Sequence, residues 1–264
     1  VSNNNANNSL AISTYKITHS PTANVSQPVS KTPGNTSSNA IGNDVQLTDL
    51  SANRSYTITV KNVNSDDMES VSSSSITKTT LPIKPVLSSS STESTTSKVS
   101  FDVANSNENG SLVISNYKVF VDGLLNSTKT PANTSADATG VDTEITVSDA
   151  NKSYSVTCVN VNSADMESAV SDSITLTTLP VAPLLSSSST TSSKTTVNFD
   201  LTNNNAVGSL GIKSNKVTFT PSGGTSSTVV KTVNNNANSE VDTQLTGLSK
   251  NTSYSVTAVN VNTQ

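Results

Sequence analysis

Aromatic residues are rare in this sequence: Phe, Tyr and Trp make up 3% of its 264 residues, and tryptophan is absent. Hydrophobic residues reach only 32%, which is little for one large core of the kind that an enzyme of this length builds. Several thin cores are the simpler expectation. Charged residues are also scarce, at 13% with a net charge of −4, whereas disordered chains of low hydrophobicity usually carry high charge. Composition therefore leaves folded and disordered states open.

Histidine and cysteine occur once each, as His19 and Cys158. A single cysteine excludes an intrachain disulfide and a cysteine-rich zinc site. No apolar run approaches the ~20 residues of a membrane-crossing helix, so we expect no membrane span. The 15 Lys and Arg residues are spread along the chain without a basic stripe, which disfavours nucleic-acid binding.

Small polar residues dominate instead. The sequence contains 50 Ser, 39 Thr and 33 Asn, which together are 122 of its 264 residues. Two Ser-Thr runs, at 88–96 and 186–196, have low complexity. They are compatible with a flexible edge strand and with a stalk that carries O-linked sugars, and both possibilities stay open.

A segment that contains a tyrosine occurs three times. Ser55–Asn64 returns at 153–162 and again at 253–262, and its tyrosines are separated by 98 and 100 residues. A second marker, Thr-Thr-Leu-Pro at 79–82, recurs at 177–180, again 98 residues further on. A period near one hundred residues indicates repeated domains, because solenoid repeats are much shorter.

Within each repeat the hydrophobic period is two. In the first tyrosine segment, apolar residues at 56, 58 and 60 alternate with polar residues at 57, 59 and 61, which is typical of a strand with one face buried. Similar alternation occurs at 99–103, 117–121 and 141–147, and clusters of Asn, Gly, Asp and Ser separate these runs. Short strands at such intervals predict an antiparallel β-sandwich.

In the second repeat, an apolar strand at 99–101 is followed by an Asn-Gly loop at 109–111, a strand around Tyr117, the tyrosine strand, and a last strand at 173–180. This order resembles strands B, C, F and G of a fibronectin type III domain. The resemblance covers the whole chain. It implies an all-β fold of tandem antiparallel immunoglobulin-like/fibronectin type III β-sandwiches, with the first and last modules incomplete.

The tyrosine corner is the most specific part of the resemblance. The family has Leu, Pro, Thr and Tyr at alternate positions, and the third repeat has Leu248, Lys250, Thr252 and Tyr254 there. The resemblance implies, in each repeat, a hydrogen bond between the tyrosine hydroxyl and the backbone a few residues upstream. The structural tyrosines would be Tyr56, Tyr154 and Tyr254.

Some positions depart from the family. Phe101 and Phe199 stand where the family has Trp in strand B, and Asn215 replaces the strand C tyrosine in the third repeat. Such losses of apolar volume predict thinner cores and lower stability per module.

We expect three modules, at residues 1–82, 83–180 and 181–264. The first lacks strands A and B, the second is complete, and the third lacks strand G. Because residue 1 is Val, we expect a fragment or a processed product, with any signal peptide or anchor outside it. Truncation of a longer array explains the missing strands, and so does a neighbouring chain that supplies them by β-augmentation and forms a fibre.

Residues that could carry chemistry are few, and we expect no catalytic, cofactor-binding or metal-binding residues and no enzyme activity. His19 falls near the end of a strand without a second histidine or a recurring acid beside it, so a structural place is favoured. Cys158 has the inward parity of its strand and is predicted to be an inert core residue. No phosphate loop, metal-ligand spacing or nucleophile elbow is present.

The loop after the tyrosine strand is acidic, and in the second repeat it reads Ala-Asp-Met-Glu at 164–167. It lacks the glycine-punctuated pattern of a calcium loop, so a solvated loop is the default. In the resembled family this loop often presents a binding motif. The candidate contact residues are therefore Asp165, Met166 and Glu167.

Acceptor sites for N-glycosylation, Asn-x-Ser/Thr, occur nine times. About eleven are expected by chance from this composition, so their number is not an excess. Three recur at the tight turn before the tyrosine strand, which we expect to be exposed: Asn53, Asn151 and Asn251. The other candidates are Asn7, Asn24, Asn35, Asn109, Asn126 and Asn133.

Three further asparagines, Asn62, Asn160 and Asn260, have the inward parity of the tyrosine strand. Buried amides need partners, so we predict bonds to backbone at the strand end or to neighbouring side chains.

These features favour a non-catalytic extracellular or cell-surface array with a structural or adhesive role: a stalk, spacer or fibre subunit without cofactors. Protein partners, copies of the chain in a filament, and glycans are the expected contacts. Two alternatives stay open, a receptor-type module that binds a protein partner through its loops and an accessory module of a secreted enzyme.

Overall fold

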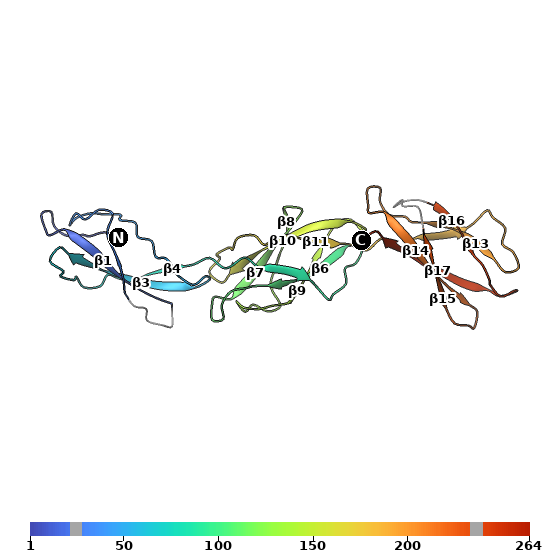
Figure 1. Ribbon diagram of the computed structural model, residues 1–264, viewed down its shortest axis with the longest axis horizontal. Helices are drawn as coiled ribbons and strands as arrows, with labels where there is room; N and C mark the ends of the chain where they lie inside the picture. Colours follow the sequence, from blue (N-terminus) through green and yellow to red (C-terminus); the bar gives the residue numbers. More distant parts are fainter. Residues whose placement is uncertain (22–27, 233–239) are drawn as a thin grey trace.

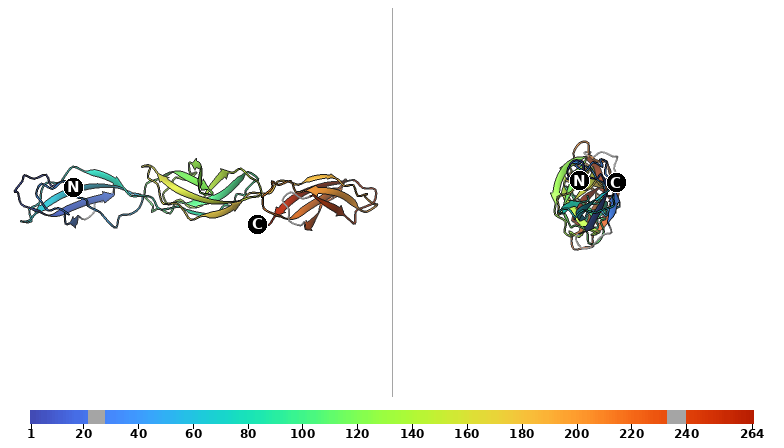
Figure 2. Two further views of the ribbon diagram at one scale, coloured as in Figure 1. Left: turned by 90° about the horizontal axis from the view of Figure 1, so that it is seen from above. Right: turned by 90° about the vertical axis from the view of Figure 1, so that its left-hand side faces the viewer.

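In the computed structural model, which describes residues 1–21, 28–232 and 240–264, the elements of secondary structure are strands. They fall into three sets that follow one another along the length of the molecule (Figure 1). We call the sets module 1 (β1 to β4), module 2 (β5 to β11) and module 3 (β12 to β17). Views from above and from one end show a narrow rod with the modules in line (Figure 2).

Module 2 contains two antiparallel sheets. Strands β5 (Val86–Ser89), β6 (Lys98–Ala104) and β9 (Val141–Thr146) form one sheet in the order β5-β6-β9. Strands β7 (Ile114–Val121), β8 (Leu124–Lys129), β10 (Ser153–Asn162) and β11 (Ile174–Thr177) form the other, in the order β11-β10-β7-β8. This is the A-B-E and G-F-C-C′ order of a fibronectin type III sandwich, as the sequence predicts.

Module 3 repeats this plan with one strand fewer. Strands β12 (Leu184–Ser187), β13 (Val197–Thr202) and β16 (Glu240–Leu245) pair in the order β12-β13-β16. Strands β14 (Ile212–Pro221), β15 (Ser227–Thr232) and β17 (Tyr254–Asn262) pair in the order β15-β14-β17. The tyrosine strand β17 is therefore an edge strand here, whereas β10 lies between β7 and β11.

Module 1 has one sheet, β2-β1-β3-β4, formed by β1 (Ile12–Pro21), β2 (Val29–Lys31), β3 (Ser55–Asn64) and β4 (Ile76–Thr79). Among the described residues, no strand equivalent to β5 or β6 pairs into a second sheet across its inner face. A groove of about 440 Å³ remains on that face, lined by apolar residues that include Ile17, Val45, Leu47, Ile58 and Val60.

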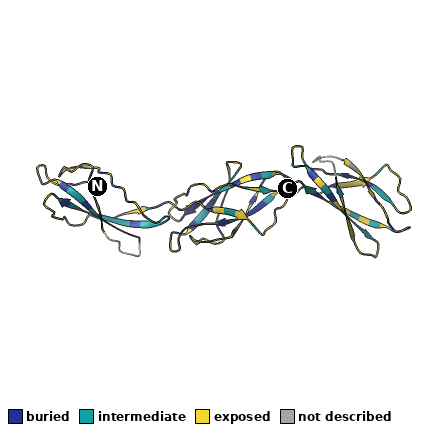
Figure 3. Ribbon diagram, viewed as in Figure 1, coloured by how far each residue is buried: buried dark blue, intermediate teal, exposed yellow. Residues whose placement is uncertain are grey.

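The cores follow from the period-two pattern of the strands. Along β9 every second residue is buried, beginning with Val141, so apolar side chains face the other sheet and polar ones face water. Buried positions lie along the strands, and the connecting loops are mostly exposed (Figure 3). Cys158 has no exposed surface and packs within the core of module 2, as the parity of its strand predicts.

A tyrosine fixes the entry to the tyrosine strand in every module. The main-chain N–H of the residue five positions upstream donates to the tyrosine hydroxyl at 2.9 Å in module 1 and at 2.8 Å in modules 2 and 3. This is the contact that a tyrosine corner implies. The pairs are Ser51 with Tyr56, Asp149 with Tyr154, and Ser249 with Tyr254.

Candidate functional site at the junctions between modules

The turn before each tyrosine strand contains an asparagine in the left-handed backbone conformation, with φ of 56° at Asn53, 55° at Asn151 and 50° at Asn251. Asparagine adopts this conformation more readily than most residues with a Cβ. In modules 1 and 2 this turn lies at the end of the module that faces the next module along the chain. Its conformation therefore decides which polar groups meet the next module.

At the first junction Asn53 is completely buried against module 2. Its amide nitrogen donates to the Leu112 carbonyl oxygen at 2.6 Å, and the Leu112 N–H donates back to the Asn53 carbonyl oxygen at 2.9 Å. The Asn162 amide nitrogen donates to Asn53 Oδ1 at 2.8 Å. We call this set, Asn53 with its module 2 partners, the asparagine latch. It satisfies both ends of a buried amide, as buried polar groups require.

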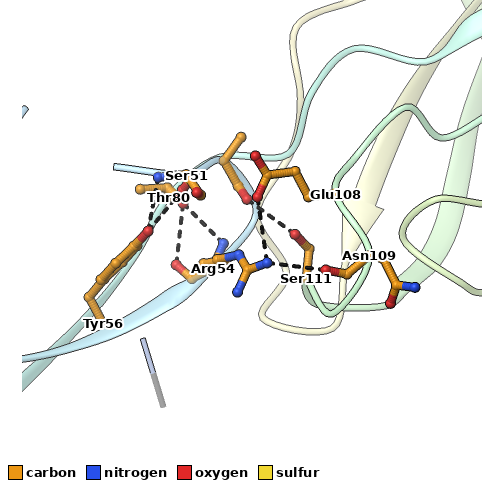
Figure 4. Close-up of polar contacts among 8 residues, drawn as sticks. Ser51, Arg54, Tyr56, Thr80, Glu108, Asn109 and Ser111 are labelled. Atoms are coloured by element: carbon orange, nitrogen blue, oxygen red, sulfur yellow. Dashed lines mark hydrogen bonds and ion pairs between the residues drawn. The ribbon is translucent and has the colours of Figure 1, made fainter. Parts of the chain in front are cut away.

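Further polar contacts surround the latch (Figure 4). An Arg54 guanidinium nitrogen lies 3.5 Å from a Glu108 carboxylate oxygen and donates to the Asn109 carbonyl oxygen at 3.1 Å. The Thr80 hydroxyl donates to the Ser51 carbonyl oxygen at 2.8 Å and accepts from the Arg54 N–H at 3.0 Å. These bonds hold the latch turn against the start of the linker.

The linker between modules 1 and 2 is held from both sides. On module 1, the Asn53 N–H donates to the Leu81 carbonyl oxygen at 2.9 Å. On module 2, Asn107 Oδ1 accepts from the Ile83 N–H at 2.8 Å, and the Asn160 amide donates to the Ile83 carbonyl oxygen at 3.1 Å. Bonds on both sides of so short a linker restrict its motion.

The second junction repeats the first. The Asn151 amide nitrogen donates to the Leu210 carbonyl oxygen at 2.6 Å, and the Leu210 N–H donates to the Asn151 carbonyl oxygen at 2.9 Å. The linker is held again, with the Val181 N–H donating to Asn205 Oδ1 at 2.9 Å. One bond is missing: Asn151 Oδ1 is buried without a partner among the described residues.

The exposure expected for two glycosylation acceptors is wrong. Asn53 and Asn151 have no exposed surface, because the following module covers the turn. Asn251 occupies the same turn in module 3 and is exposed. Asn24 lies outside the described residues. The remaining acceptors are exposed: Asn7, Asn35, Asn109, Asn126 and Asn133.

A repeated signal could have revealed the junction. A Ser-Leu pair occurs at 9–10, 111–112 and 209–210, just before β1, β7 and β14. In the second and third pairs the leucine is the backbone partner of a turn asparagine. A pair outside the strands, together with a repeated asparagine in a turn, indicates two surfaces that meet. One module considered alone does not show this.

The acidic loop of module 2 lies beside the first junction. Asn162 Oδ1 accepts from the Ala164 N–H at 3.0 Å and the Met166 N–H at 2.9 Å, while its amide nitrogen holds Asn53. Asp165 and Glu167 are exposed and Met166 is half-buried, and Glu167 pairs with Lys118 at 2.5 Å. The three candidate contact residues therefore lie on a well-braced loop, with Asp165 and Glu167 exposed.

The inward asparagines of the tyrosine strand bond backbone, as predicted. Asn160 donates to the Asn105 carbonyl oxygen at 3.1 Å, in addition to its linker bond. Asn260 donates to the Asn203 carbonyl oxygen at 2.7 Å and to the Val181 carbonyl oxygen at 2.8 Å. Asn62 donates to the Asn3 carbonyl oxygen at 3.1 Å. These amides tie each core to the loop at its leading end.

The two residues with reactive side chains have structural surroundings. Burial raises the pKa of the Cys158 thiol to about 12, which keeps it protonated and unreactive near neutral pH. The His19 ring packs edge-on against Tyr56 at 5.9 Å between ring centroids. Within the described residues no three His, Cys, Asp or Glu side chains are placed to hold a metal ion. No helix in that part of the chain is long and apolar enough to cross a membrane.

Comparison with known proteins gives remote structural similarity. No protein-family model matches the sequence, and no curated protein matches it. The chain is similar to the crystal structure of chicken CNTN1 FN1–FN3 domains at 12% identity, over 97% of this chain and 86% of that chain, with a TM-score of 0.34. It is also similar to fibronectin(III)-like modules of Clostridium thermocellum CbhA at 14% identity, over 66% and 82%, with a TM-score of 0.27.

Strand order and tyrosine corners together define the class of this protein. It is an all-β array of tandem fibronectin type III-like sandwiches. Both internal boundaries share the two bonds between the turn asparagine and the leucine backbone, which are the part of the asparagine latch that repeats.

Proposed function

We propose that this protein is a non-catalytic spacer: an extended array with a structural or adhesive role outside the cell or at its surface. The observation that carries the proposal is the recurrence of the asparagine latch at both internal junctions, with amide-to-carbonyl distances of 2.6 Å at each. A contact that repeats at every boundary fixes each module against the next. Repetition of that contact produces length and stiffness.

The linkers support the same role. The first contains Pro82 and Pro85, which restrict the backbone, and its ends are bonded to both modules. Modules within one chain usually move relative to one another unless something opposes the motion. Here the latch and the held linker oppose it, so a rod is the favoured shape.

The charged residues of the surface favour a solvated, non-catalytic role. Ion pairs such as Lys98 with Glu144 and Lys118 with Glu167 are exposed and isolated, so they contribute little to stability and form no convergent site. If the chain is secreted, we expect N-linked glycans at exposed acceptors, including Asn35 and Asn133. Asn53 and Asn151 should stay unmodified in the docked array, because their amide nitrogens are buried donors.

The proposal is tested by removing the donor of each latch without changing its shape. In the variant Asn53→Asp/Asn151→Asp, a carboxylate replaces the amide and faces the carbonyl oxygens of Leu112 and Leu210. Burying an unpartnered polar group costs about 1–3 kcal/mol, which is enough to undock a small interface. We expect small-angle X-ray scattering to show a shorter maximum dimension and a hinged profile.

A matched control keeps the charge change and leaves the junctions intact. In Asn35→Asp/Asn133→Asp, both side chains are exposed, and their oxygens accept from the N–H groups of Ser37 and Ser135, which a carboxylate also accepts. This variant should scatter as the unmodified rod. A latch variant with an unchanged rod profile would contradict the spacer proposal.

Recognition of a protein partner is the alternative function, and the acidic loop of module 2 is its candidate surface. The loop is exposed at Asp165 and Glu167 and is braced by Asn162. Alanine at 165–167 separates the two functions: a spacer keeps its cell-surface role, whereas a receptor that uses this loop loses its ligand.

A further inference from the structure

The turn before β7 contains the single Asn-Gly pair of the sequence, Asn109–Gly110. The Ser111 N–H donates to the Glu108 carbonyl oxygen at 3.1 Å, and Gly110 has a φ of 78°. This is a β-turn whose third residue has a positive φ, which glycine adopts without strain. The pair therefore has a fixed place at the first junction, directly before the Ser-Leu pair whose leucine belongs to the asparagine latch.

Both groups that could react with each other in this pair are free. The Asn109 side chain is exposed and points away from the Arg54 contacts (Figure 4). Within residues 1–21, 28–232 and 240–264, no hydrogen bond holds its amide group or the Gly110 main-chain N–H. Because glycine has no Cβ to crowd its nitrogen, that nitrogen can approach Cγ of the asparagine. Two groups held this close react at a high effective concentration.

The equivalent turns of the other modules lack this combination. In module 1 the turn contains Asn7–Asn8, where Asn8 replaces the glycine with a φ of 67° and the Asn7 side chain accepts from Asn39. In module 3 it contains Val207–Gly208, with a φ of 88° at the glycine. The N–H to carbonyl bond that closes the turn is 3.2 Å long in both modules. Among these three turns, a free asparagine followed by glycine therefore occurs in module 2 alone.

We propose that Asn109 is a site of spontaneous deamidation, with water as the only co-reactant. The Gly110 nitrogen loses its proton to water and forms a bond to Cγ of Asn109. The Cγ–Nδ2 bond breaks, and the side-chain nitrogen takes up a proton and leaves as ammonia, which produces a five-membered succinimide. Water then adds to one of the two ring carbonyls. Opening at Cγ gives aspartate, and opening at the main-chain carbonyl gives isoaspartate, in which the chain runs through Cβ and Cγ.

The modification changes the first junction. Either product adds a negative charge there, and isoaspartate also makes the main chain of the turn one atom longer. The Asn109 carbonyl oxygen that accepts from Arg54 at 3.1 Å then becomes part of a free carboxylate. The altered turn directly precedes the leucine that Asn53 bonds, so we expect this junction to loosen while the second junction is unaffected. The loosening rests on the spacer proposal, whereas the modification itself does not.

The test follows the whole chain, produced without glycosylation, during incubation at neutral and mildly alkaline pH. The proteolytic peptide that contains residue 109 should gain the mass of an NH2-to-OH exchange, and isoaspartate-specific methylation should label the same peptide. The rate should rise with pH, because the attacking nitrogen must first lose a proton. A folded chain that gains no mass at residue 109, under conditions where the urea-unfolded chain does, overturns the proposal.

Three variants test the geometry of the turn. Asn109→Gln lengthens the side chain, so the five-membered ring cannot form and the mass gain should be lost. Val207→Asn supplies the missing side chain before Gly208 and should produce a second mass gain, at the second junction. Asn7→Gln is the matched control, because it changes an asparagine at the same turn position that no glycine follows, and it should leave the gain at residue 109 unchanged. A Val207→Asn chain that gains no mass at residue 207 overturns the role assigned to the turn.

Small-angle X-ray scattering separates the modification from its effect on the rod. After incubation we expect the chain to show a shorter maximum dimension, and the Asn109→Gln chain treated in the same way should keep the profile of the fresh rod. A modified chain that keeps the rod profile overturns the loosening and leaves the modification site standing. A fresh chain that is not a rod contradicts the spacer proposal and leaves the mass measurement to decide the modification.

Discussion

Modules 2 and 3 share a plan and differ in the depth of their cores. Among the described residues, the core cluster of module 2 has thirteen buried members and that of module 3 has five. On the tyrosine strands, Tyr154, Val156 and Cys158 are buried, whereas their counterparts at 254, 256 and 258 are half-buried. The difference in burial has a structural cause: β10 pairs with β11 on one side, whereas within the described residues β17 has no strand paired on the corresponding side.

A central side chain contributes as well. Tyr117 is completely buried and donates its hydroxyl to Asn105 Oδ1 at 2.7 Å. Its counterpart Asn215 donates to Asn203 Oδ1 at 3.1 Å and to Asn260 Oδ1 at 2.5 Å. The polar bond survives the exchange, but the volume of the ring is lost. One plan thus accommodates an aromatic or a polar centre that donates to the equivalent asparagine, Asn105 or Asn203.

The largest effect is expected from truncating the strand B phenylalanine. Phe101 is completely buried, and Phe101→Ala should destabilise module 2 by about 3–5 kcal/mol. Phe199 is 7% exposed and lines an open groove, so water can enter the space, and Phe199→Ala should cost about 2 kcal/mol. Cys158 is the only cysteine, so its rate of thiol labelling reports the opening of module 2 specifically.

Hydrogen exchange along β13 and β14 gives the matching measurement for module 3. Equal losses in the two modules would contradict the difference in core depth.

Exchanging the central residues Tyr117 and Asn215 between the two modules separates the contribution of ring volume to stability from the contribution of hydrogen bonding. Tyr117→Asn keeps a donor for Asn105 but leaves a cavity, and we expect a loss of about 2–3 kcal/mol by thiol labelling of Cys158. Asn215→Tyr should increase protection from hydrogen exchange along β14 and β17. A destabilised Asn215→Tyr variant would show instead that module 3 has repacked around its amide.

The smallest effect concerns pH and a pair of carboxylates on β13 and β16. Burial and the neighbouring Asp242 raise the pKa of Asp200. Because its folded pKa is above its unfolded value of about 4, folded module 3 loses stability as the pH rises through that range. Asp200→Asn removes this loss.

We therefore expect the Tm of module 3 to rise by no more than a few degrees at pH 7. The difference should disappear near pH 2–3, where the Asp200 carboxyl group, whose pKa is raised, is protonated and neutral. A shift of the same size at both pH values would contradict an electrostatic cause.

Features that depend on the residues of a single module were predictable from the sequence. Alternation located the strands, and the position of Cys158 on an inward face followed from the same period. The hydroxyl contact of Tyr154 followed from the spacing of the tyrosine corner. Each depends on residues close in sequence or on one sheet, where local geometry decides the outcome.

The junction was not predictable in this way. Asn53 occupies a tight turn, and a turn of a single module is exposed by default. Its burial depends on Leu112, 59 residues away, and on Asn162, 109 residues away. Neither residue belongs to the same module, so one module considered alone does not show that the surfaces meet; the signal is the recurrence of the Ser-Leu pair and the turn asparagine between modules.

The held linker also has a mechanical consequence. A pulling force along the rod crosses each junction through the short linker, between β4 and β5 or between β11 and β12. Only a few hydrogen bonds lie beside this linker. Each sandwich, in contrast, resists the force through the hydrogen bonds of whole strand pairs. The junctions should therefore yield first. Each would lengthen by no more than the slack in its linker, at most about 3.6 Å per residue, and then re-form when the load is removed. A rod built in this way absorbs small extensions while its modules stay folded.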